Sequence, residues 1–158
     1  MDSNKHDKDG QLKNGIFKEY FTDGTLSSVG KYVNGEKTGE WKYYLRNGSI
    51  KAAGKYLKGK MIGEWKWYRD NGNLLQVGQL KDDKKIGRWK RYHANGVLYD
   101  KGDYLDNEKI GEWKTYHESG KLSKTKKSRP KKLSSDVQHI WDAFSTSGKN
   151  YLSCKFAL

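Results

Sequence analysis

Gly63-Glu64-Trp65-Lys66 is one copy of a four-residue motif that returns every 24 residues along the chain. A fixed period of this length is typical of repeat proteins, in which one unit cannot bury its apolar side alone and is stabilised by its neighbours. The motif therefore predicts an array of five similar units, with an extended surface rather than one deep pocket. The other copies are Gly39-Glu40-Trp41-Lys42, Gly87-Arg88-Trp89-Lys90, Gly111-Glu112-Trp113-Lys114 and the weaker Gly15-Ile16-Phe17-Lys18.

A turn dipeptide follows each copy of the motif. Three of the five are Asn-Gly, the strongest short-range signal for a β-hairpin, which favours a two-residue type I′ turn. With that turn Trp41 pairs across its hairpin with Gly54, and we expect the indole to cover the bare glycine backbone. Trp65 with Gly78 and Trp89 with Gly102 follow the same rule. The dipeptides are Asp23-Gly24, Asn47-Gly48, Asn71-Gly72, Asn95-Gly96 and Ser119-Gly120.

A second turn leads from each hairpin into the next unit. Five hairpins joined in this way predict an all-β fold, an elongated single-layer antiparallel meander of about ten strands. At two strands per unit and roughly 4.8 Å between strands, the array would be on the order of 45 Å long. The second turns lie around Asn34-Gly35, Lys58-Gly59, Asp82-Asp83 and Asp106-Asn107.

The predicted pairing sorts the side chains onto two faces, because cross-strand partners point to the same side of a sheet. One face would carry the tryptophans with Tyr32, Tyr56 and Tyr104 and the aliphatic residues that follow each turn, namely Leu26, Ile50, Leu74, Leu98 and Leu122. The other would carry the motif lysines beside Glu40, Glu64 and Glu112, with Tyr20, Tyr44, Tyr68, Tyr92 and Tyr116 toward the turns.

The composition agrees with a thin sheet covered by rings. Only 34% of the 158 residues are hydrophobic, but 13% are aromatic, and 18 glycines stand against one proline. The net charge of +13 is uneven: residues 1–14 carry 0, residues 15–120 carry +6 and residues 121–158 carry +7. No apolar run has the length of a signal peptide or a membrane span, and the single cysteine, Cys154, cannot form an internal disulfide. We therefore expect a soluble cytoplasmic protein.

The units resemble the MORN repeat variant. Their pattern reads G-x-W-x-x-Y-x-x-N-G-x-L followed by G-x-Y-x-N-G-x-K-x-G, carried in full by residues 39–62 and 63–86, nearly so by 87–110, and partly by 15–38 and 111–122. The match is closest to bacterial proteins of the YwqK antitoxin family. The resemblance implies a non-enzymatic protein that binds a protein partner, with the neutralising half of a toxin-antitoxin pair as its specific form. MORN repeats at large are also credited with attachment to membrane lipids.

The chain departs from the pattern after Leu122, because Lys126 and Ser128 stand where a glycine and a tyrosine would continue the unit. We predict four segments: a flexible stretch 1–14, the repeat array 15–122, a basic linker 123–134, and a short amphipathic helix with its tail over 135–158. Val137, Ile140, Trp141 and Phe144 recur at helical spacing. This helix could cap the last hairpin, bind a partner or lie on a membrane surface.

Aromatic residues are the candidate partner-binding residues. Those that the repeat does not require are Trp67, Tyr43 and Tyr99, and the motif tryptophans Trp41, Trp65, Trp89 and Trp113 are either core or a recognition surface. A second candidate surface, for a membrane or a partner, is the tail. Its residues are Lys124, Lys126, Lys127, Arg129, Lys131, Lys132, Ile140, Trp141 and Phe144.

Other chemistry has little support in the sequence. His93 and His117 occupy equivalent positions about 10 Å apart, too far for one metal ion, and no nucleotide-binding or nucleophile motif is present. We expect no enzyme activity, no metal, no cofactor and no nucleic-acid partner. The predicted function is a protein-binding scaffold, with a cognate toxin as the specific partner. The alternative is a scaffold held at the inner, anionic membrane face by the basic tail and helix.

Overall fold

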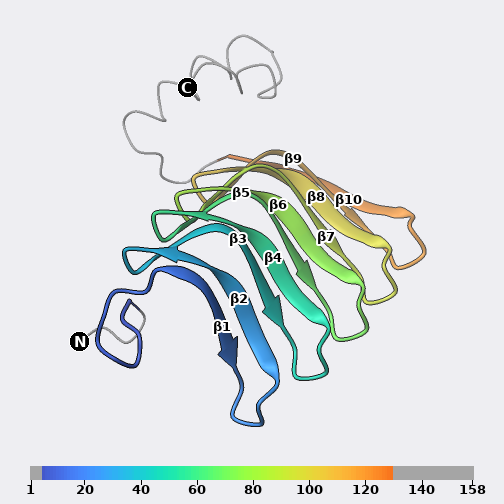
Figure 1. The fold of residues 1–158 in the computed structure, drawn as a ribbon. Helices are drawn as coiled ribbons and strands as arrows, with labels where there is room; N and C mark the ends of the chain where they lie inside the picture. The colour runs from blue at the N-terminus through green and yellow to red at the C-terminus, as the bar shows by residue number, and fades with distance from the viewer. Residues whose placement is uncertain (1–4, 130–158) are drawn as a thin grey trace.

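The computed structural model describes residues 5–129, which form one open antiparallel sheet of ten strands in chain order (Figure 1). Each interior strand pairs with the strand before it and the strand after it, and each of the two edge strands pairs with one neighbour, as a meander requires. The all-β repeat fold is confirmed, and the predicted helix lies outside the described residues. The strands are β1 Gly15–Tyr20, β2 Leu26–Val33, β3 Glu36–Tyr44, β4 Ile50–Leu57, β5 Lys60–Tyr68, β6 Leu74–Lys81, β7 Lys84–Tyr92, β8 Leu98–Leu105, β9 Glu108–Tyr116 and β10 Leu122–Ser128.

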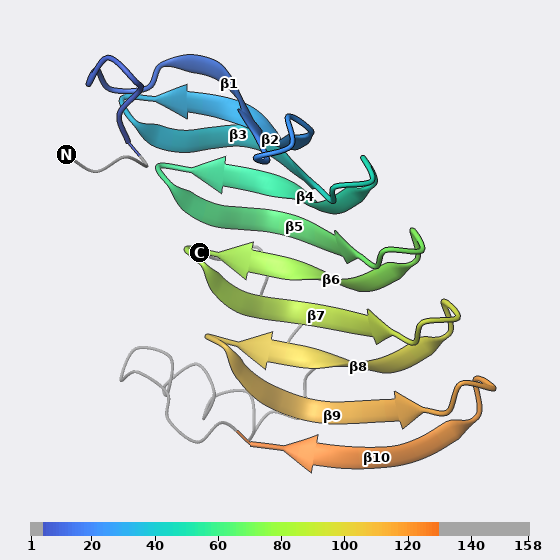
Figure 2. The ribbon, with the colours of Figure 1, turned by 90° about the horizontal axis from the view of Figure 1, so that it is seen from below.

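All ten strands arch in the same sense, and β1 and β10 form the two edges of the sheet (Figures 1 and 2). The bend has a local cause in the glycine of each motif. Gly39 has a φ of 65° and lies where the register between β2 and β3 shifts, between the pairs Gly30–Trp41 and Lys31–Thr38. Such a bulge bends and twists a strand. Gly63, Gly87 and Gly111 repeat the same positive φ.

The turn after each motif differs from the predicted two-residue type I′ turn. Leu45 N donates to Ser49 O and Gly48 N donates to Leu45 O, while only Gly48, and not Asn47, has a positive φ. This is a three-residue loop in which a type I turn ends on a left-handed glycine. A type I′ turn needs positive φ at both central residues, and here asparagine does not adopt it. The prediction of the turn type is therefore wrong.

A bulge beside each loop restores the register. Tyr44 pairs with Ile50, one residue out of the predicted register, and the next pair, Tyr43 with Ala52, is back in it. Trp41 therefore does pair with Gly54, as predicted. The aliphatic residue after the loop lies instead on the face of its tyrosine partner, opposite the tryptophans. This corrects the predicted position of Leu26, Ile50, Leu74, Leu98 and Leu122.

Type I′ turns occur between units. Asn34 and Gly35 have φ values of 49° and 75°, and the other three inter-unit turns show the same pair of positive angles. Successive turns are also hydrogen-bonded to one another: Gly59 N donates to Lys37 O at 2.9 Å and Asn107 N to Lys85 O at 3.1 Å. Backbone bonds between neighbouring turns thus fix the stacking of one unit on the next.

Each indole covers the glycine of the preceding unit and not the glycine of its own hairpin. A Cβ built on Gly54 would lie 2.1 Å from the ring of Trp65, and no atom of Trp41 is among its nearest neighbours. The Trp65 Nε1 donates to the carbonyl of Lys55 at 3.1 Å, directly beside the register shift that follows Ala53. The predicted direction of ring coverage is therefore wrong, although the pairing is right. The corresponding contacts elsewhere are Gly30 with Trp41, Gly78 with Trp89 and Gly102 with Trp113.

Both ends of the array differ from the predicted segments. Residues 5–14, expected to be flexible, form a turn closed by a bridge between His6 and Leu12 and by Lys13 N donating to Lys5 O. The Lys13 carbonyl accepts from Gly35 N, just as Lys37 accepts from Gly59 in the next unit. This segment therefore completes the first unit. At the other end, β10 continues to Ser128, so the first half of the predicted linker is strand.

Candidate protein-binding surface

The motif tryptophans form the core of the sheet. Trp41, Trp65 and Trp89 are at most 1% exposed and Trp113 is 5% exposed. Neighbouring rings pack edge-on against them, as Tyr56 does against Trp65 with 5.2 Å between ring centroids. These four tryptophans therefore offer almost no surface to a partner, and their burial favours the core role over the recognition role.

Lysine side chains complete the cover over three of these indoles. The Nζ atoms of Lys37, Lys85 and Lys109 lie 4.1, 4.5 and 3.9 Å from the ring centroids of the tryptophan four residues further on. A cation over an indole face is attracted by the ring quadrupole. A single-layer sheet can thus bury its rings without a second layer.

Tyr43 and Trp67 extend the core outward. Both are partly exposed and follow a motif tryptophan by two residues, on the same face. Trp67 stacks on Trp65 and on Trp89, with centroid separations of 5.8 and 5.6 Å and nearly parallel planes. Tyr43 stacks on Trp41 in the same way, 6.0 Å away. One face of the sheet therefore carries a continuous stack of rings whose outer members reach the surface.

The position of Tyr43 and Trp67 in the repeat is a variable one. In every unit the residue two places after the motif aromatic is partly exposed and has a different side chain. We call this set the variable row; it comprises Glu19, Tyr43, Trp67, Arg91 and Thr115. The motif glycine, aromatic residue and lysine recur in every unit, while the side chain in the row changes from acidic to aromatic to basic to a hydroxyl. Comparing equivalent positions across the units would have revealed Glu19, Arg91 and Thr115 from the sequence.

Charged members of the row are held by neighbours on the same face. Two of the three guanidinium nitrogens of Arg91, Nε and Nη2, donate to the carboxylate of Asp100, a residue that is 3% exposed, and the bond from Nε measures 2.9 Å. Glu19 accepts from Ser28 Oγ at 2.7 Å. A buried carboxylate paired in this way fixes the arginine that it holds. The row is therefore a preorganised surface rather than a set of free side chains.

Tyr99, the third predicted aromatic, lies beside the row. It is 38% exposed, its ring packs edge-on against His93 at 5.0 Å, and the Arg91 guanidinium lies 5.2 Å from its centroid. The structure thus brings Tyr99 next to Arg91 while Tyr43 and Trp67 form the centre of the same region.

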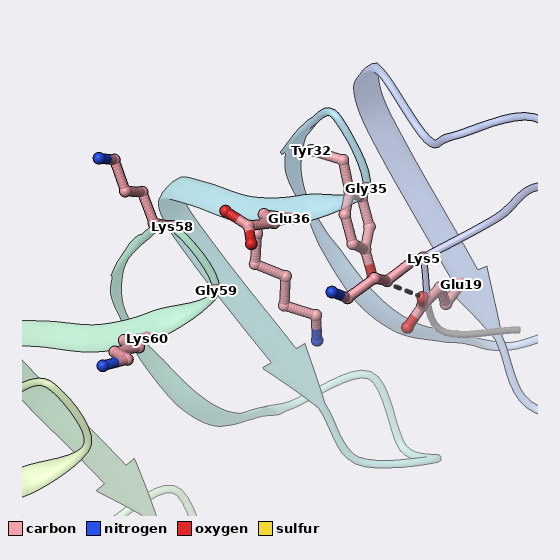
Figure 3. A pocket seen from close by; sticks show the side chains of 9 residues that line it. Lys5, Glu19, Tyr32, Gly35, Glu36, Lys58, Gly59 and Lys60 are labelled. Atoms are coloured by element: carbon pink, nitrogen blue, oxygen red, sulfur yellow. Dashed lines mark hydrogen bonds between the residues drawn. The ribbon is translucent and has the colours of Figure 1, made fainter. Parts of the chain in front are cut away.

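A cavity of about 390 Å³ lies at the N-terminal end of the sheet, between the first two inter-unit turns (Figure 3). The hydroxyl of Tyr32 donates to Glu19 at 3.4 Å there, and the Lys13 ammonium lies 3.7 Å from the same carboxylate. Four lysines and two glutamates line the cavity, so it carries both charges with an excess of cations. Its lining residues are Lys5, Glu19, Tyr32, Gly35, Glu36, Lys37, Lys58, Gly59 and Lys60.

Burial shifts the proton affinities of a small network on the tryptophan face. Lys37 Nζ donates to the Tyr43 hydroxyl at 2.9 Å, and the Tyr43 and Tyr56 hydroxyls are 3.0 Å apart. Loss of solvation raises the pKa of Tyr43 well above its usual value, and the contact with Tyr56 adds to the rise. Burial also lowers the pKa of Lys37. These groups make stability depend on pH in the alkaline range.

We expect Tyr43→Phe to reduce the alkaline loss of stability. A tyrosine whose folded-state pKa is raised contributes stability that is complete below its unfolded value, about pH 10, and is lost as pH rises beyond it. Lys37 acts in the opposite direction, because its lowered pKa is a cost that disappears as pH rises. Melting temperatures from about pH 8 to about pH 11 should therefore fall less steeply in the variant. An unchanged slope would contradict this assignment.

The opposite face is a solvated ionic surface. Lys66 pairs with Glu64 at 3.2 Å, Lys114 with Glu112 at 3.0 Å, and the fourth motif has Arg88 bonded to Asp103 at 2.9 Å. Surface pairs of this kind contribute little to stability. Two of the five motif lysines, Lys66 and Lys114, are thus paired with acids on their own face, and Lys18, Lys42 and Lys90 are exposed to solvent.

The tail candidates are only partly covered by the structure. Lys124, Lys126 and Lys127 belong to β10, and Arg129 follows it directly. The predicted residues Lys131, Lys132, Ile140, Trp141 and Phe144 lie outside the described residues. His93 contacts the carbonyl of Tyr116 at 2.9 Å, and within residues 5–129 no group of side chains is arranged to hold a metal ion. None of these residues forms a helix with the length and apolarity of a membrane span.

The hairpin geometry and the period agree with one repeat family. The MORN repeat variant matches residues 13–34, 37–58, 61–82, 85–106 and 109–126, more than half of the chain. The protein belongs to the MORN repeat variant family. The five matches to this MORN repeat coincide with the five hairpins, and the first begins at Lys13, the residue whose carbonyl completes the first inter-unit turn.

Other comparisons add little to the family assignment. No curated protein matches this MORN repeat protein. Among solved structures, it is similar to a mutant of S. aureus TarM in complex with Fondaparinux, alpha-GlcNAc-glycerol and UDP, with 10% identity over 61% of this chain and 19% of that chain and a TM-score of 0.39. It is also similar to the GtfA/B complex bound to UDP and GlcNAc, with 11% identity, 92% and 32% coverage and a TM-score of 0.30. This protein therefore spans less than a third of either chain.

Proposed function

We propose that this MORN repeat protein is a non-enzymatic scaffold that binds a protein partner through the variable row. The proposal rests on one observation: four of the five units share a buried motif tryptophan, whereas the residue two places after the motif aromatic is partly exposed and differs in each unit. An interface commonly takes its energy from a few aromatic and arginine anchors at its centre. Trp67 and Arg91 occupy such a place in the third and fourth units.

The partner that we propose is a cognate toxin, which would make this protein an antitoxin or immunity component. The resemblance of the repeats to the YwqK antitoxin family supports this role. The chain's charge of +13 favours a partner with an acidic surface. We propose no catalytic role, because Arg91 and Glu19 are engaged with Asp100 and Ser28 in the described region.

Two glutamines of β6 provide a matched test of the variable row. Gln76 lies between Trp67 and Arg91 on the tryptophan face, and Gln79 lies opposite Glu64 on the other face. We expect Gln76→Arg to weaken binding of the protein encoded by the neighbouring gene at least tenfold, because a long cation is placed between the two anchors. Gln79→Arg adds the same charge on the same strand and should change binding less than twofold. Copurification from co-expressing cells followed by titration calorimetry measures both effects.

Three results would speak against the proposal. If the neighbouring gene product does not copurify with the parent chain, a toxin encoded there is not the partner. If Gln76→Arg and Gln79→Arg weaken binding equally, the variable row is not the interface. Failure of the parent chain to restore growth to cells that produce the neighbouring protein would remove the antitoxin role. Melting curves of both variants show whether the sheet is intact.

A further inference from the structure

β10 is an open edge strand with a single sign of charge. Its residues are exposed from Leu122 to Lys127, and its outer side pairs with no other strand among residues 5–129. Figure 2 shows it at the opposite edge from β1. No acidic residue occurs between positions 119 and 129, whereas cations occur five times. These cations are Lys121, Lys124, Lys126, Lys127 and Arg129.

The cations lie on both faces of the strand. Lys126 pairs with Trp113 and Lys124 with Thr115, so both lie on the tryptophan face. Lys127 pairs with Glu112 and lies on the other face. An extended segment placed along this edge would therefore meet positive charge above and below its own backbone.

Lys126 also prevents the array from continuing. In the earlier units its position is a glycine, and a Cβ on Gly102 would lie 2.2 Å from the ring of the following tryptophan, Trp113. A lysine leaves no room there for the indole of a sixth unit. A second copy of the chain could extend the sheet only by placing its Phe17 against Lys126. The edge is thus closed to another repeat, while no strand among residues 5–129 uses its outer backbone groups.

Each of the earlier units is followed by a turn that packs against it, but no described turn follows the last inter-unit turn. In the earlier units the carbonyls of Lys13, Lys37, Met61 and Lys85 each accept from the backbone of the next turn. Lys109 is the next residue in this series, and no described turn follows it. A cavity of about 410 Å³ lies beside it, with Lys109, Lys126, Lys127 and Arg129 against the single acid Glu108. Tyr104, Asn107 and Ser128 complete the lining.

We propose that the free edge of β10 receives an acidic, extended segment of a protein partner as an eleventh strand. Backbone hydrogen bonds to an exposed edge supply affinity in this mode, and alternating side chains supply specificity. Here the specificity is electrostatic: carboxylates of the segment face Lys124 and Lys126 on one side and Lys127 on the other. The cationic cavity receives the end of the segment. The inference rests on the proposed protein-binding function and identifies the chemistry of the partner.

Lysines on an edge strand also discourage association of identical chains. That effect is compatible with the proposal, because a second copy of β10 is repelled by the charges that attract an acidic strand. The two explanations differ in one observable property. If the lysines serve only to prevent edge-to-edge association, no added strand should bind. If β10 is the proposed site, an acidic strand should bind and a neutral one should not.

The test uses the full chain and a labelled peptide of about ten residues in which glutamate alternates with threonine and valine. Two further peptides are compared: one with glutamine in place of glutamate, and one with glutamate but N-methylated at alternate residues, which removes backbone donors. Fluorescence anisotropy measures the affinity of each. We expect binding of the glutamate peptide, at least tenfold weaker binding of the glutamine peptide and no binding of the methylated peptide.

Charge-reversal variants locate the site. Lys126→Glu combined with Lys127→Glu should weaken binding of the glutamate peptide about tenfold or more, as expected when two attractions become repulsions. Lys42→Glu combined with Lys90→Glu makes the same change in net charge on exposed lysines of β3 and β7, and should weaken it less than twofold. Hydrogen exchange should show added protection of β10 amides in the parent chain. Circular dichroism of both variants confirms that the sheet is retained.

The inference is overturned if the full chain does not bind the glutamate peptide. Equal binding of the methylated peptide, or equal effects of the two double variants, would also overturn it, since either result indicates attraction without strand addition. Gln76→Arg should bind the peptide like the parent chain. If the glutamate peptide does not bind, the proposed function is not contradicted, because that function is tested at the variable row. If the variable-row test fails, the proposed strand addition at β10 is not contradicted.

Discussion

Trp65→Ala is expected to lower the free energy of unfolding by about 3–5 kcal/mol, the range measured when large buried aromatic residues are truncated. Trp65 has no exposed surface, and rings from three strands contact it: Tyr43, Tyr56 and Trp67. A single-layer sheet has no second layer that could move in to fill the cavity. Urea unfolding followed by circular dichroism measures the loss.

The matched control for this experiment is the next residue. Lys66→Ala removes an exposed side chain from the opposite face of the same strand and should change stability by less than about 0.5 kcal/mol. Because each unit contacts only its neighbours, loss of the central indole should also weaken the coupling between the two halves of the array. A broader or biphasic transition in Trp65→Ala is then expected. A loss below about 1 kcal/mol would show that Trp65 is not part of the core.

The period and the turn residues were sufficient to predict the sheet, its strand order and the pairing of Trp41 with Gly54. They were not sufficient to predict the turns themselves. Asn47-Gly48 permits either a type I′ turn or a three-residue loop, and the difference of one residue is cancelled by a bulge near Lys51. Two compensating shifts leave the central pairing unchanged and move only Ile50 to the other face. No single-residue preference contains that information, because the bulge is a property of the whole hairpin.

Prediction of the binding surface was limited in a different way. Trp67 and Tyr43 were identified because they depart from the repeat, and both lie in the variable row. Arg91 was not predicted in this way, because a single arginine is not distinctive in a basic repeat. Its role depends on the bond to Asp100, which only the structure shows. Lys126 and Ser128 were recognised as departures, but their meaning depends on the ring direction. Only when each indole is known to cover the preceding glycine does Lys126 become the residue that closes the array.

Gly54→Ala is the substitution that tests this ring direction. The added Cβ would lie 2.1 Å from the Trp65 ring, so the indole and the backbone must move apart, and we expect a loss of about 3 kcal/mol. Ala53→Ser adds one atom to the neighbouring residue of the same strand, on the opposite face, and should cost less than about 1 kcal/mol. Urea unfolding again provides the measurement.

Gly54 has a tryptophan on each side, and a double-mutant cycle distinguishes the two. If Trp65 covers the glycine, Gly54→Ala in the Trp65→Ala background should cost less than about 1 kcal/mol, a coupling of about 2 kcal/mol. In the Trp41→Ala background the same substitution should keep nearly its full cost, because Trp41 pairs with Gly54 through the backbone but directs its ring toward Gly30. The reverse pattern would mean that each indole covers the glycine of its own hairpin. In that case position 126 would be covered by Trp113 of its own hairpin, and Lys126 would not exclude the indole of a further unit.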